Sequence, residues 1–147
     1  MSIIIRRYTE ADIPAIFLLL KEFTTFQKTP EKLIVTEQQM KEDATLFQCF
    51  VAEDTLTNKI IGYACFSFVY YSWSGKALYL DDLYVTDECR GKNIGSQLMN
   101  NVITLAKENN CKKMRWQVSK WNSNAQAFYQ KLGATIDDVE INCDLLF

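Results

Sequence analysis

The middle of the chain constrains its fold most, because two different periodicities meet there across a short turn. Residues 78–85 are rich in apolar and aromatic side chains, which is typical of a strand. From Ile94 to about Asn110, apolar residues recur instead at the spacing of one helix face. The turn between these segments carries Gly91 and Gly95. A strand that leads through a glycine turn into an amphipathic helix predicts an α/β fold, with helices packed on a sheet.

Two capping boxes before this segment mark helix starts. In Thr9 with Asp12, and in Thr36 with Gln39, a hydroxyl and an acid or amide three residues later can satisfy each other's backbone amides. We therefore expect one helix to begin at the first box and a shorter one to run from residue 36 toward residue 44. Residues 23–35, between these helices, lack a clear period and are expected to be irregular.

Strand signals lie on both sides of the middle segment. β-branched and aromatic residues predict strands at 3–5, 47–52 and 60–71, and again at 114–118 after the long helix. A last helix is expected over residues 123–132, stopped by Gly133. One or two closing strands are expected over residues 135–147. The order β-α-α-β-β-β-α-β-α-β fits one domain over residues 1–147, a usual size for a single hydrophobic core.

Charge and hydropathy argue against two classes of partner. Sixteen Lys and Arg against eighteen Asp and Glu give a formal net charge of -2, so the chain has no positive excess for a nucleic acid. Its apolar runs are much shorter than the ~20 residues of a membrane span, and its first residues do not read as a secretory signal. We expect no nucleic-acid and no membrane partner.

The chain has five cysteines and no histidine, and both counts restrict its chemistry. The cysteines are scattered and odd in number, which indicates reduced thiols in a cytoplasmic protein. Without histidine there can be no Ser-His-Asp or Cys-His nucleophile and no His-containing metal site. We expect no metal, and any catalysis must use carboxylates, tyrosine, amides or a cofactor.

The residues of the turn have the composition of an anion site. Glycines allow backbone amides to approach a ligand closely, and the first amides of a helix lack an internal partner and carry the positive end of its dipole. A pyrophosphate suits such a site, and Asn93 stands where a left-handed residue is expected. Alternatively, the two glycines are ordinary turn and cap residues. The seven residues of the turn are Arg90, Gly91, Lys92, Asn93, Ile94, Gly95 and Ser96.

The turn resembles the signature Arg/Gln-x-x-Gly-x-Gly/Ala of the GNAT superfamily of acyl-CoA N-acyltransferases, with Asn93 in place of the middle glycine. Residues 73–76, 79–85, 121–122 and 128–129 are similar to the spermidine/spermine and thialysine acetyltransferase branch. The resemblance implies a mixed, mostly antiparallel twisted sheet of about six to seven strands, flanked by about four helices and splayed at the cofactor site. It also implies acetyl-CoA as co-substrate.

Acetyl transfer to an amine needs a base, because a free alkylamine with a pKa of ~10.4 is protonated at neutral pH. Asp81 is the expected base, acting through water, and it stands where the resembled enzymes have Glu. Asp82 would point to the opposite sheet face by strand alternation. Tyr129 matches the family's catalytic tyrosine and is the expected general acid toward the CoA thiolate. Alternatively, the two acids are solvated strand-end residues and Tyr129 packs in the core.

The resemblance also implies which residues contact the cofactor and the acceptor. The amides of Leu83, Tyr84 and Val85 would lie along the pantetheine arm, and one near Val85 would polarise the thioester oxygen. Asn122 would hydrogen-bond the cofactor, or else cap the last helix. Further cofactor contacts would be Asn124, Ala125 and Phe128, and the acceptor contacts would be Gln27, Trp73, Asp81 and Asp82.

Together these features predict an N-acetyltransferase that moves acetyl from acetyl-CoA to a primary amine by direct attack. The acceptor would be a small cation such as a polyamine, thialysine or an amino acid. Gln27 and Tyr71 stand where the polyamine enzymes have acids, which leaves the acceptor open. The alternatives are a protein or peptide N-acetyltransferase and a non-catalytic acetyl-CoA sensor. A homodimer is expected by analogy, and the apolar end Leu145-Leu146-Phe147 would suit its interface.

Overall fold

The computed structural model describes residues 1–147, which form two compact units, Met1–Trp116 and Gln117–Phe147. The first unit is built on a five-stranded sheet in the order β1-β2-β3-β4-β5. Neighbours from β1 to β4 are antiparallel, and β5 runs parallel to β4. The sheet is therefore mixed and mostly antiparallel, as predicted, with fewer strands than expected. Its strands are β1 Ile3–Arg7, β2 Gln48–Asp54, β3 Lys59–Tyr71, β4 Gly75–Val85 and β5 Lys113–Arg115.

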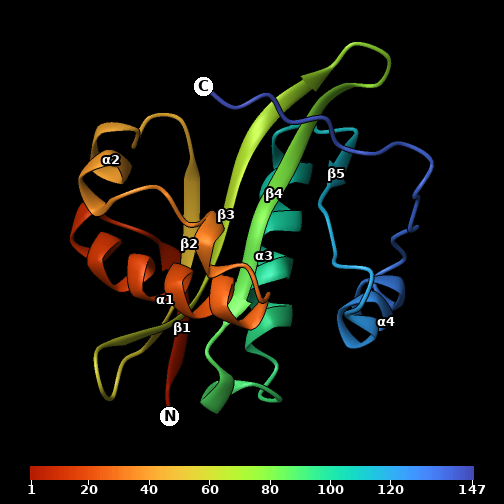
Figure 1. The fold of residues 1–147 in the computed structure, drawn as a ribbon. Helices are drawn as coiled ribbons and strands as arrows, with labels where there is room; N and C mark the ends of the chain where they lie inside the picture. The colour runs from red at the N-terminus through yellow and green to blue at the C-terminus, as the bar shows by residue number, and fades with distance from the viewer. The chain divides into compact units, whose positions relative to one another are not determined.

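Helices cover both faces of this sheet, with α1 and α2 on one face and α3 on the other (Figure 1). Tyr63 of β3 packs with Ile13 of α1, whereas the adjacent Gly62 faces Leu98 of α3. A Cβ at position 62 would lie 2.9 Å from the carbonyl oxygen of Tyr84 on β4 and 3.3 Å from the Leu98 side chain of α3, so glycine leaves room for both. The helices are α1 Ile13–Phe26, α2 Glu37–Glu42 and α3 Ile94–Glu108.

Both capping boxes are present, as the sequence predicted. Thr9 and Asp12 flank a single 3₁₀ turn that leads directly into α1. Thr36 caps α2, where its hydroxyl accepts a hydrogen bond from the amide of Gln39 at 3.1 Å. These starts depend on residues three positions apart, which is why a single sequence can predict them.

The end of α1 lies further along the chain than predicted. The helix continues to Phe26, so the expectation of an irregular segment from residue 23 is wrong for its first four residues. Phe23 stacks on Tyr84 of β4, with 5.0 Å between the ring centroids. This contact with a distant strand stabilises a helical turn that the local sequence pattern does not mark.

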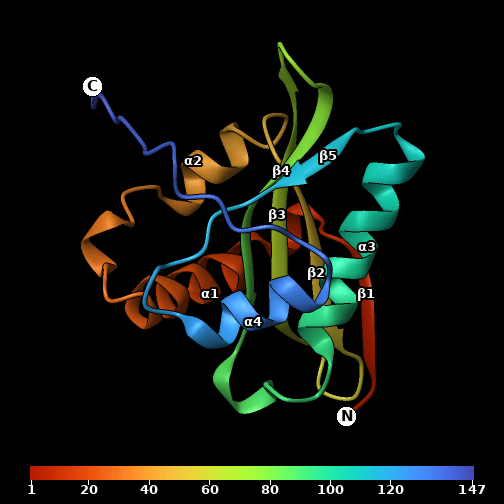
Figure 2. The same cartoon turned by 90° about the vertical axis from the view of Figure 1, so that its right-hand side faces the viewer.

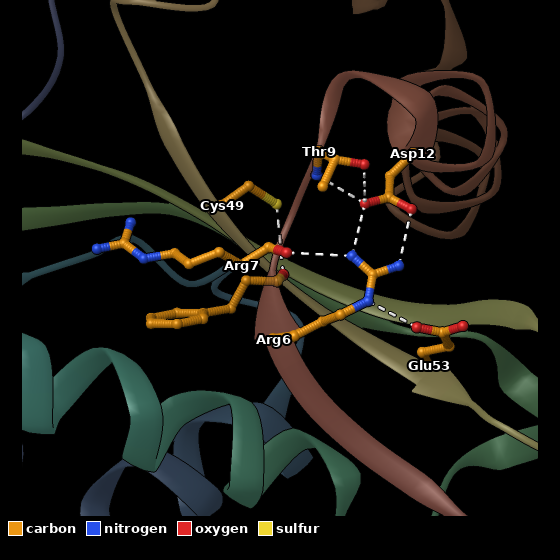
Figure 3. A network of polar contacts seen from close by, with 7 residues as sticks. Arg6, Arg7, Thr9, Asp12, Cys49 and Glu53 are labelled. Atoms are coloured by element: carbon orange, nitrogen blue, oxygen red, sulfur yellow. Dashed lines mark hydrogen bonds and ion pairs between the residues drawn. The ribbon is translucent and has the colours of Figure 1, made fainter.

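A charged network fixes β1 to β2 and to the start of α1 (Figure 3). The guanidinium of Arg6 donates two hydrogen bonds to Asp12, at 2.8 and 3.0 Å, and a third to Glu53 at 2.6 Å. The same Asp12 carboxylate accepts the backbone amide of Thr9 at 2.7 Å. One carboxylate therefore serves both the cap of the first helical turn and the ion pair to the edge strand.

We predict that Asp12→Asn lowers the free energy of unfolding by about 2 kcal/mol at pH 7, because a charge-assisted pair and a cap are lost together. The hydrogen bonds from Arg6 hold the pKa of Asp12 below its ordinary value of 3.8. Its contribution is therefore full above that value and is lost as the pH falls through the lowered pKa. Urea denaturation at pH 7 and at pH 3 measures both effects.

The control for this prediction is Asp138→Asn, which removes an exposed acid of the second unit. This variant should unfold like the parent protein. An equal loss of stability in Asp12→Asn at both pH values would contradict the assignment of the effect to the ionised carboxylate.

Strand β5 is shorter than predicted, and this shapes the edge of β4. Only Lys113–Arg115 pairs with β4, opposite residues 77–79, so the predicted strand at 114–118 is wrong beyond Arg115. Figure 2 shows β5 crossing beside β4. Strand β4 continues for six more residues, Leu80 to Val85, without a neighbour on that side. The edge is thus open where the resemblance implied a splayed sheet.

The second unit contains one helix, α4 Ser123–Lys131, and no strand. The helix is followed by Gly133, which has a positive φ of 91° as expected for a helix stop. The prediction of closing strands over residues 135–147 is wrong. Apolar Val139 and Ile141 alternate there with acids, but both side chains are exposed and pair with no strand edge. None of the chain's helices combines the length and apolar character that crossing a bilayer requires.

Candidate active site

The start of α3 has the geometry of an anion-binding turn. Asn93 adopts the predicted left-handed conformation, with φ 64° and ψ 15°, and its side chain caps no helix amide. The amide of Gln97 is the first in the helix to find a backbone acceptor there, the carbonyl of Asn93 at 3.1 Å. The amides of Ile94, Gly95 and Ser96 therefore point out of the helix end without an intrahelical partner. Together with the helix dipole they favour a bound anion.

Gly91 and Gly95 are each explained by a different physical reason. Gly91 has a positive φ of 77°, so its conformation alone accounts for glycine. Gly95 has no positive φ, and a Cβ there would meet only the Val85 side chain, at an ordinary 3.9 Å. Glycine inside a helix costs about 1 kcal/mol relative to alanine. Since no intramolecular contact requires it, the bare backbone at Gly95 is suited to the close approach of a ligand.

Arg90 turns its side chain back onto the protein. Its Nε donates to the carbonyl of Val85 at 3.1 Å, and Nη1 donates to Asp87 at 3.1 Å. The guanidinium also lies 4.4 Å from the ring centroid of Phe26 and 5.3 Å from that of Tyr84. Arg90 thus fastens the turn to β4 and α1. The exposed Lys92 is the other cation of the turn.

The open edge of β4 presents backbone amides close to this turn. Thr86 donates its amide to Ile61 of β3 at 2.9 Å, so its main chain faces β3. Because main-chain direction alternates along a strand, the amides of Val85 and Leu83 face the opposite edge, which β5 leaves open. The contact of the Val85 carbonyl with Arg90 on that side agrees with this orientation. Two parallel donors are therefore available to a ligand along β4.

A β-bulge in β4 places the two candidate acids together. Asp82 pairs with Cys65 and Leu80 pairs with Phe66, so Asp81 is an extra residue without a partner on β3. Strict alternation does not hold across a bulge, so the period of the strand no longer supports the prediction that the two acids face opposite sides. Burial raises the pKa of the Cys65 thiol, and the charges of Asp82 and Asp81 both add to that effect. The charges of both carboxylates therefore act on the same thiol.

The two carboxylates have different environments. Asp82 is half-buried and accepts a hydrogen bond of 3.0 Å from the hydroxyl of Tyr63, a side chain with no solvent exposure. Burial, and then the charge of Asp81, raise the pKa of Asp82 to about 6, against the lowering effect of Tyr63. Asp81 is exposed, and partial desolvation raises its pKa as well. Adjacent carboxylates with raised proton affinity are suited to general base chemistry near neutral pH.

The expected acceptor residues of the first unit are not all brought together. Trp73 lies in the turn between β3 and β4 and is 99% exposed. Asp81 is eight residues further along, a distance of roughly 26 Å in an extended strand. Tyr71 has its ring under Lys113 and Arg115, each 4.6 Å from the ring centroid. Gln27 follows the last residue of α1 and is half-buried.

A pocket that sequence reasoning missed lies between α1 and the end of β4. It has a volume of about 500 Å³. Glu22 of α1 accepts a hydrogen bond of 3.1 Å from the hydroxyl of Thr86, the residue after β4. Glu22 and Phe26 are one helical turn apart, and this spacing is the signal that could have marked a shared face. The lining residues are Lys21, Glu22, Thr25, Phe26, Tyr84, Asp87 and Arg90.

The remaining candidate residues belong to the second unit. Asn122 caps α4, and its side-chain oxygen accepts the amide of Ala125 at 3.1 Å, so the local cap that the sequence allowed is present. Asn124 lies in the same first turn. Tyr129 is half-buried and packs its ring 5.4 Å from that of Phe128. Burial raises the pKa of Tyr129, which keeps the phenol protonated at neutral pH and able to donate.

Known proteins share both the sequence and the fold. Residues 13–134 match the acetyltransferase (GNAT) family. The chain is 31% identical over 143 residues to thialysine N-epsilon-acetyltransferase of Sus scrofa, covering 90% of this chain and 84% of that protein. It is 32% identical over 138 residues to the human spermidine/spermine N(1)-acetyltransferase-like protein 1, covering 87% of this chain and 20% of that protein.

Among solved structures, an acetyltransferase of Trypanosoma brucei has a TM-score of 0.79 at 20% identity, covering 98% of this chain and 100% of that chain. At that identity the likeness speaks for the fold. The family match extends over most of the sequence and includes the turn before α3, the bulge in β4 and helix α4. The chain belongs to the acetyltransferase (GNAT) family and is an acyltransferase.

Proposed function

We propose that this enzyme transfers acetyl from acetyl-CoA to a primary amine of a small cationic acceptor. The observation that carries the proposal is the uncapped start of α3 beside an open strand edge. There the amides of Ile94, Gly95 and Ser96 suit a pyrophosphate, and the amides of Leu83 and Val85 suit an extended amide-containing arm. Acetyl-CoA supplies the activated acetyl group as a thioester.

In this proposal the residues of β4 have separate tasks. The amide near Val85 donates to the carbonyl oxygen of the acetyl group, an interaction worth about 3 kcal/mol in a preorganised site. Asp81 takes a proton from the incoming ammonium through water, since an amine of pKa ~10.4 must lose a proton before it attacks. Asp82 lies beside it, and its charge strengthens the attraction for a cation. The amine then attacks directly, with no acyl group on the protein.

The proposal includes one domain over residues 1–147 and also gives roles to residues of helix α4. The family match from residue 13 to 134 covers residues of both units and supports this reading. Tyr129 holds the proton that the departing thiolate needs. Asn122 contributes an amide donor beyond its capping oxygen. Further cofactor contacts are proposed for Asn124, Ala125 and Phe128, as well as Tyr84 and the turn residues Arg90, Gly91, Lys92 and Asn93.

The acceptor is proposed to be a thialysine-like, polyamine-like or amino-acid-like amine. The names of the relatives support an amine acceptor, and the two acids of the bulge supply negative charge for it. Gln27 is kept as an acceptor contact. Trp73 is likewise kept as an acceptor contact, with its exposed ring available to a cation. The alternatives are a peptide or protein acceptor and a sensor that binds acetyl-CoA without turnover.

Release of CoA with a panel of amines tests the proposal. The panel contains thialysine, spermidine, free amino acids and a lysine-containing peptide, each with acetyl-CoA. We expect turnover with a small cationic amine. Turnover with the peptide alone would assign the protein acceptor, and acetyl-CoA binding without turnover on any amine would refute catalysis in favour of the sensor.

We further propose a cytoplasmic homodimer. All five cysteines are free thiols, which suits a reducing compartment. The chain end exposes Leu145, Leu146 and Phe147, each more than 80% accessible, and these apolar side chains would gain from burial in a partner. Sizing chromatography of the full chain, beside a variant with these three residues replaced by serine, tests the dimer.

A further inference from the structure

The hydroxyl of Tyr63 is a polar group that the proposed reaction does not yet use. The side chain is completely buried between the sheet and α1, among apolar residues of the core. Its hydroxyl donates to Oδ2 of Asp82 at 3.0 Å, and the two residues come from neighbouring strands, β3 and β4. Phenylalanine would fill the same core space, so packing alone does not account for a tyrosine here.

The bulge makes this hydrogen bond relevant to the exposed acid. Asp81 is the unpaired residue of the bulge and Asp82 is the next in the chain, so the position of one carboxylate constrains that of the other. Asp82 has one oxygen engaged by Tyr63, whereas Asp81 faces solvent. A proton that reaches the pair can therefore reside on either acid. The hydrogen bond that Tyr63 donates to Asp82 changes how the proton is distributed between them.

We propose that Tyr63 is a positioning residue, whose hydroxyl holds the Asp82 carboxylate in its ionised form beside Asp81, the acid proposed to take the proton of the amine. This inference rests on the proposed function. In the step, the N–H bond of the ammonium breaks and the proton passes through water to an Asp81 oxygen. The neutral amine and the protonated Asp81 result, and the proton later leaves to solvent. The charge that remains on Asp82 increases the proton affinity of Asp81.

The helices packed on this cluster present apolar side chains to it, and the titratable groups near Asp82 come from the strands. Helix α1 presents to this cluster the apolar side chains of Ile13, Ile16 and Leu19, and α2 presents Met40. Burial, aided by the charge of Asp82, raises the pKa of the Tyr63 phenol well above its ordinary value, so Tyr63 stays a donor at neutral pH. The titratable groups around Asp82 are Asp81, Tyr79 and Tyr84 on β4, Tyr63 and Cys65 on β3, and Cys49 on β2.

The test is the pH profile of kcat/KM for the amine in Tyr63→Phe. The hydrogen bond from Tyr63 lowers the pKa of Asp82, so its loss raises that pKa and draws the shared proton onto Asp82. We expect the acid limb of the profile to move up by about 0.5 to 1 pH unit. At pH 6 this corresponds to a fall of about two- to fivefold in kcat/KM, because Asp82 has a pKa of about 6 in the parent protein, and at pH 9 the two proteins should be close. The matched control is Tyr70→Phe, an exposed tyrosine of the same strand.

A second comparison separates positioning from a loss of packing. In Asp82→Asn the carboxylate no longer titrates, so adding Tyr63→Phe to this variant should not move the acid limb further. A limb that does not move in Tyr63→Phe, or one that moves equally in the Asp82→Asn background, would overturn the inference and leave the proposed function intact. If the parent protein turns over no amine at all, the proposed function fails, and the inference fails with it.

The same profile can be checked without catalysis, in case Tyr63→Phe unfolds in the assay. Carbon NMR of the aspartate carboxyls, assigned with Asp82→Asn, gives the titration of Asp82 directly at low temperature. A higher midpoint in Tyr63→Phe supports the inference. An unchanged midpoint contradicts it.

Discussion

Replacing Tyr129 with phenylalanine is expected to lower kcat about 100-fold or more, because the departing thiolate loses its proton donor. The ring and its contact with Phe128 are retained, so the fold and the KM for acetyl-CoA should change little. Burial raises the pKa of Tyr129 above its ordinary value of 10.0. The acid form that donates is thus lost only at high pH, and the alkaline limb of kcat for the parent protein should lie above pH 10.

Steady-state release of CoA measures both parts of this prediction, with the best amine of the panel at saturation. Tyr70→Phe serves as the control, since that side chain is 78% exposed on β3 and has no proposed role. A Tyr129→Phe enzyme within threefold of the parent would assign Tyr129 to packing, which is the alternative that the sequence allowed.

Gly95→Ala is expected to make the fold more stable and to weaken the binding of acetyl-CoA. The added methyl meets only Val85 at an ordinary 3.9 Å, so the variant should be more stable by up to about 1 kcal/mol. The same methyl would stand where the pyrophosphate approaches the amides at the start of α3. We expect the Kd for acetyl-CoA to rise about 10- to 100-fold, since a displacement of the ligand by about 1 Å is costly.

Calorimetric titration with acetyl-CoA and urea denaturation measure the two effects on the same samples. Gly91→Ala is the matched comparison. Its positive φ of 77° disfavours alanine, so this variant should lose stability by about 1 kcal/mol. If Gly95→Ala binds acetyl-CoA like the parent, the glycine is an ordinary residue of the helix start and the proposed anion site is wrong.

The parts of the fold that the sequence predicted correctly depend on neighbouring residues. The two capping boxes and the start of α3 at Ile94 follow from residues within four positions of each other. The left-handed Asn93 was predicted in the same way, from the small set of residues that accept that conformation. Such features are formed by short-range sterics and hydrogen bonds, which a single sequence contains in full.

The parts that could not be predicted depend on pairing between distant segments. The bulge at Asp81 is a mismatch in length between β3 and β4, and neither strand alone reveals it. Likewise, the alternation of Val139 and Ile141 with acids is typical of a strand, yet a strand exists only where an edge is available to pair with it. Residues 135–147 have the pattern but form no strand.

The candidate site shows the same division. The backbone donors of the turn were expected from its glycines and its place before a helix. The side chain of Arg90 was expected at the cofactor, but it binds Val85 and Asp87 and stacks on Phe26. That choice depends on an aromatic residue of α1 more than sixty positions away. The hydrogen bond from Tyr63 to Asp82 needed the register of two strands and left no signal in the sequence.

Asp82, beside the bulge in β4, also gives the folded protein a higher affinity for protons than the unfolded chain has in the acid range. The ordinary pKa of Asp82 is 3.8, and burial raises it to about 6 in the fold, so between these values the folded chain binds more proton than the unfolded chain. By linkage, Asp82 favours the fold most below pH 4, and this contribution declines as the pH rises toward 6. In the proposed mechanism, Asp81 takes the proton while Asp82 is charged. The proposed reaction therefore needs a pH at which Asp82 no longer adds to the free energy of unfolding.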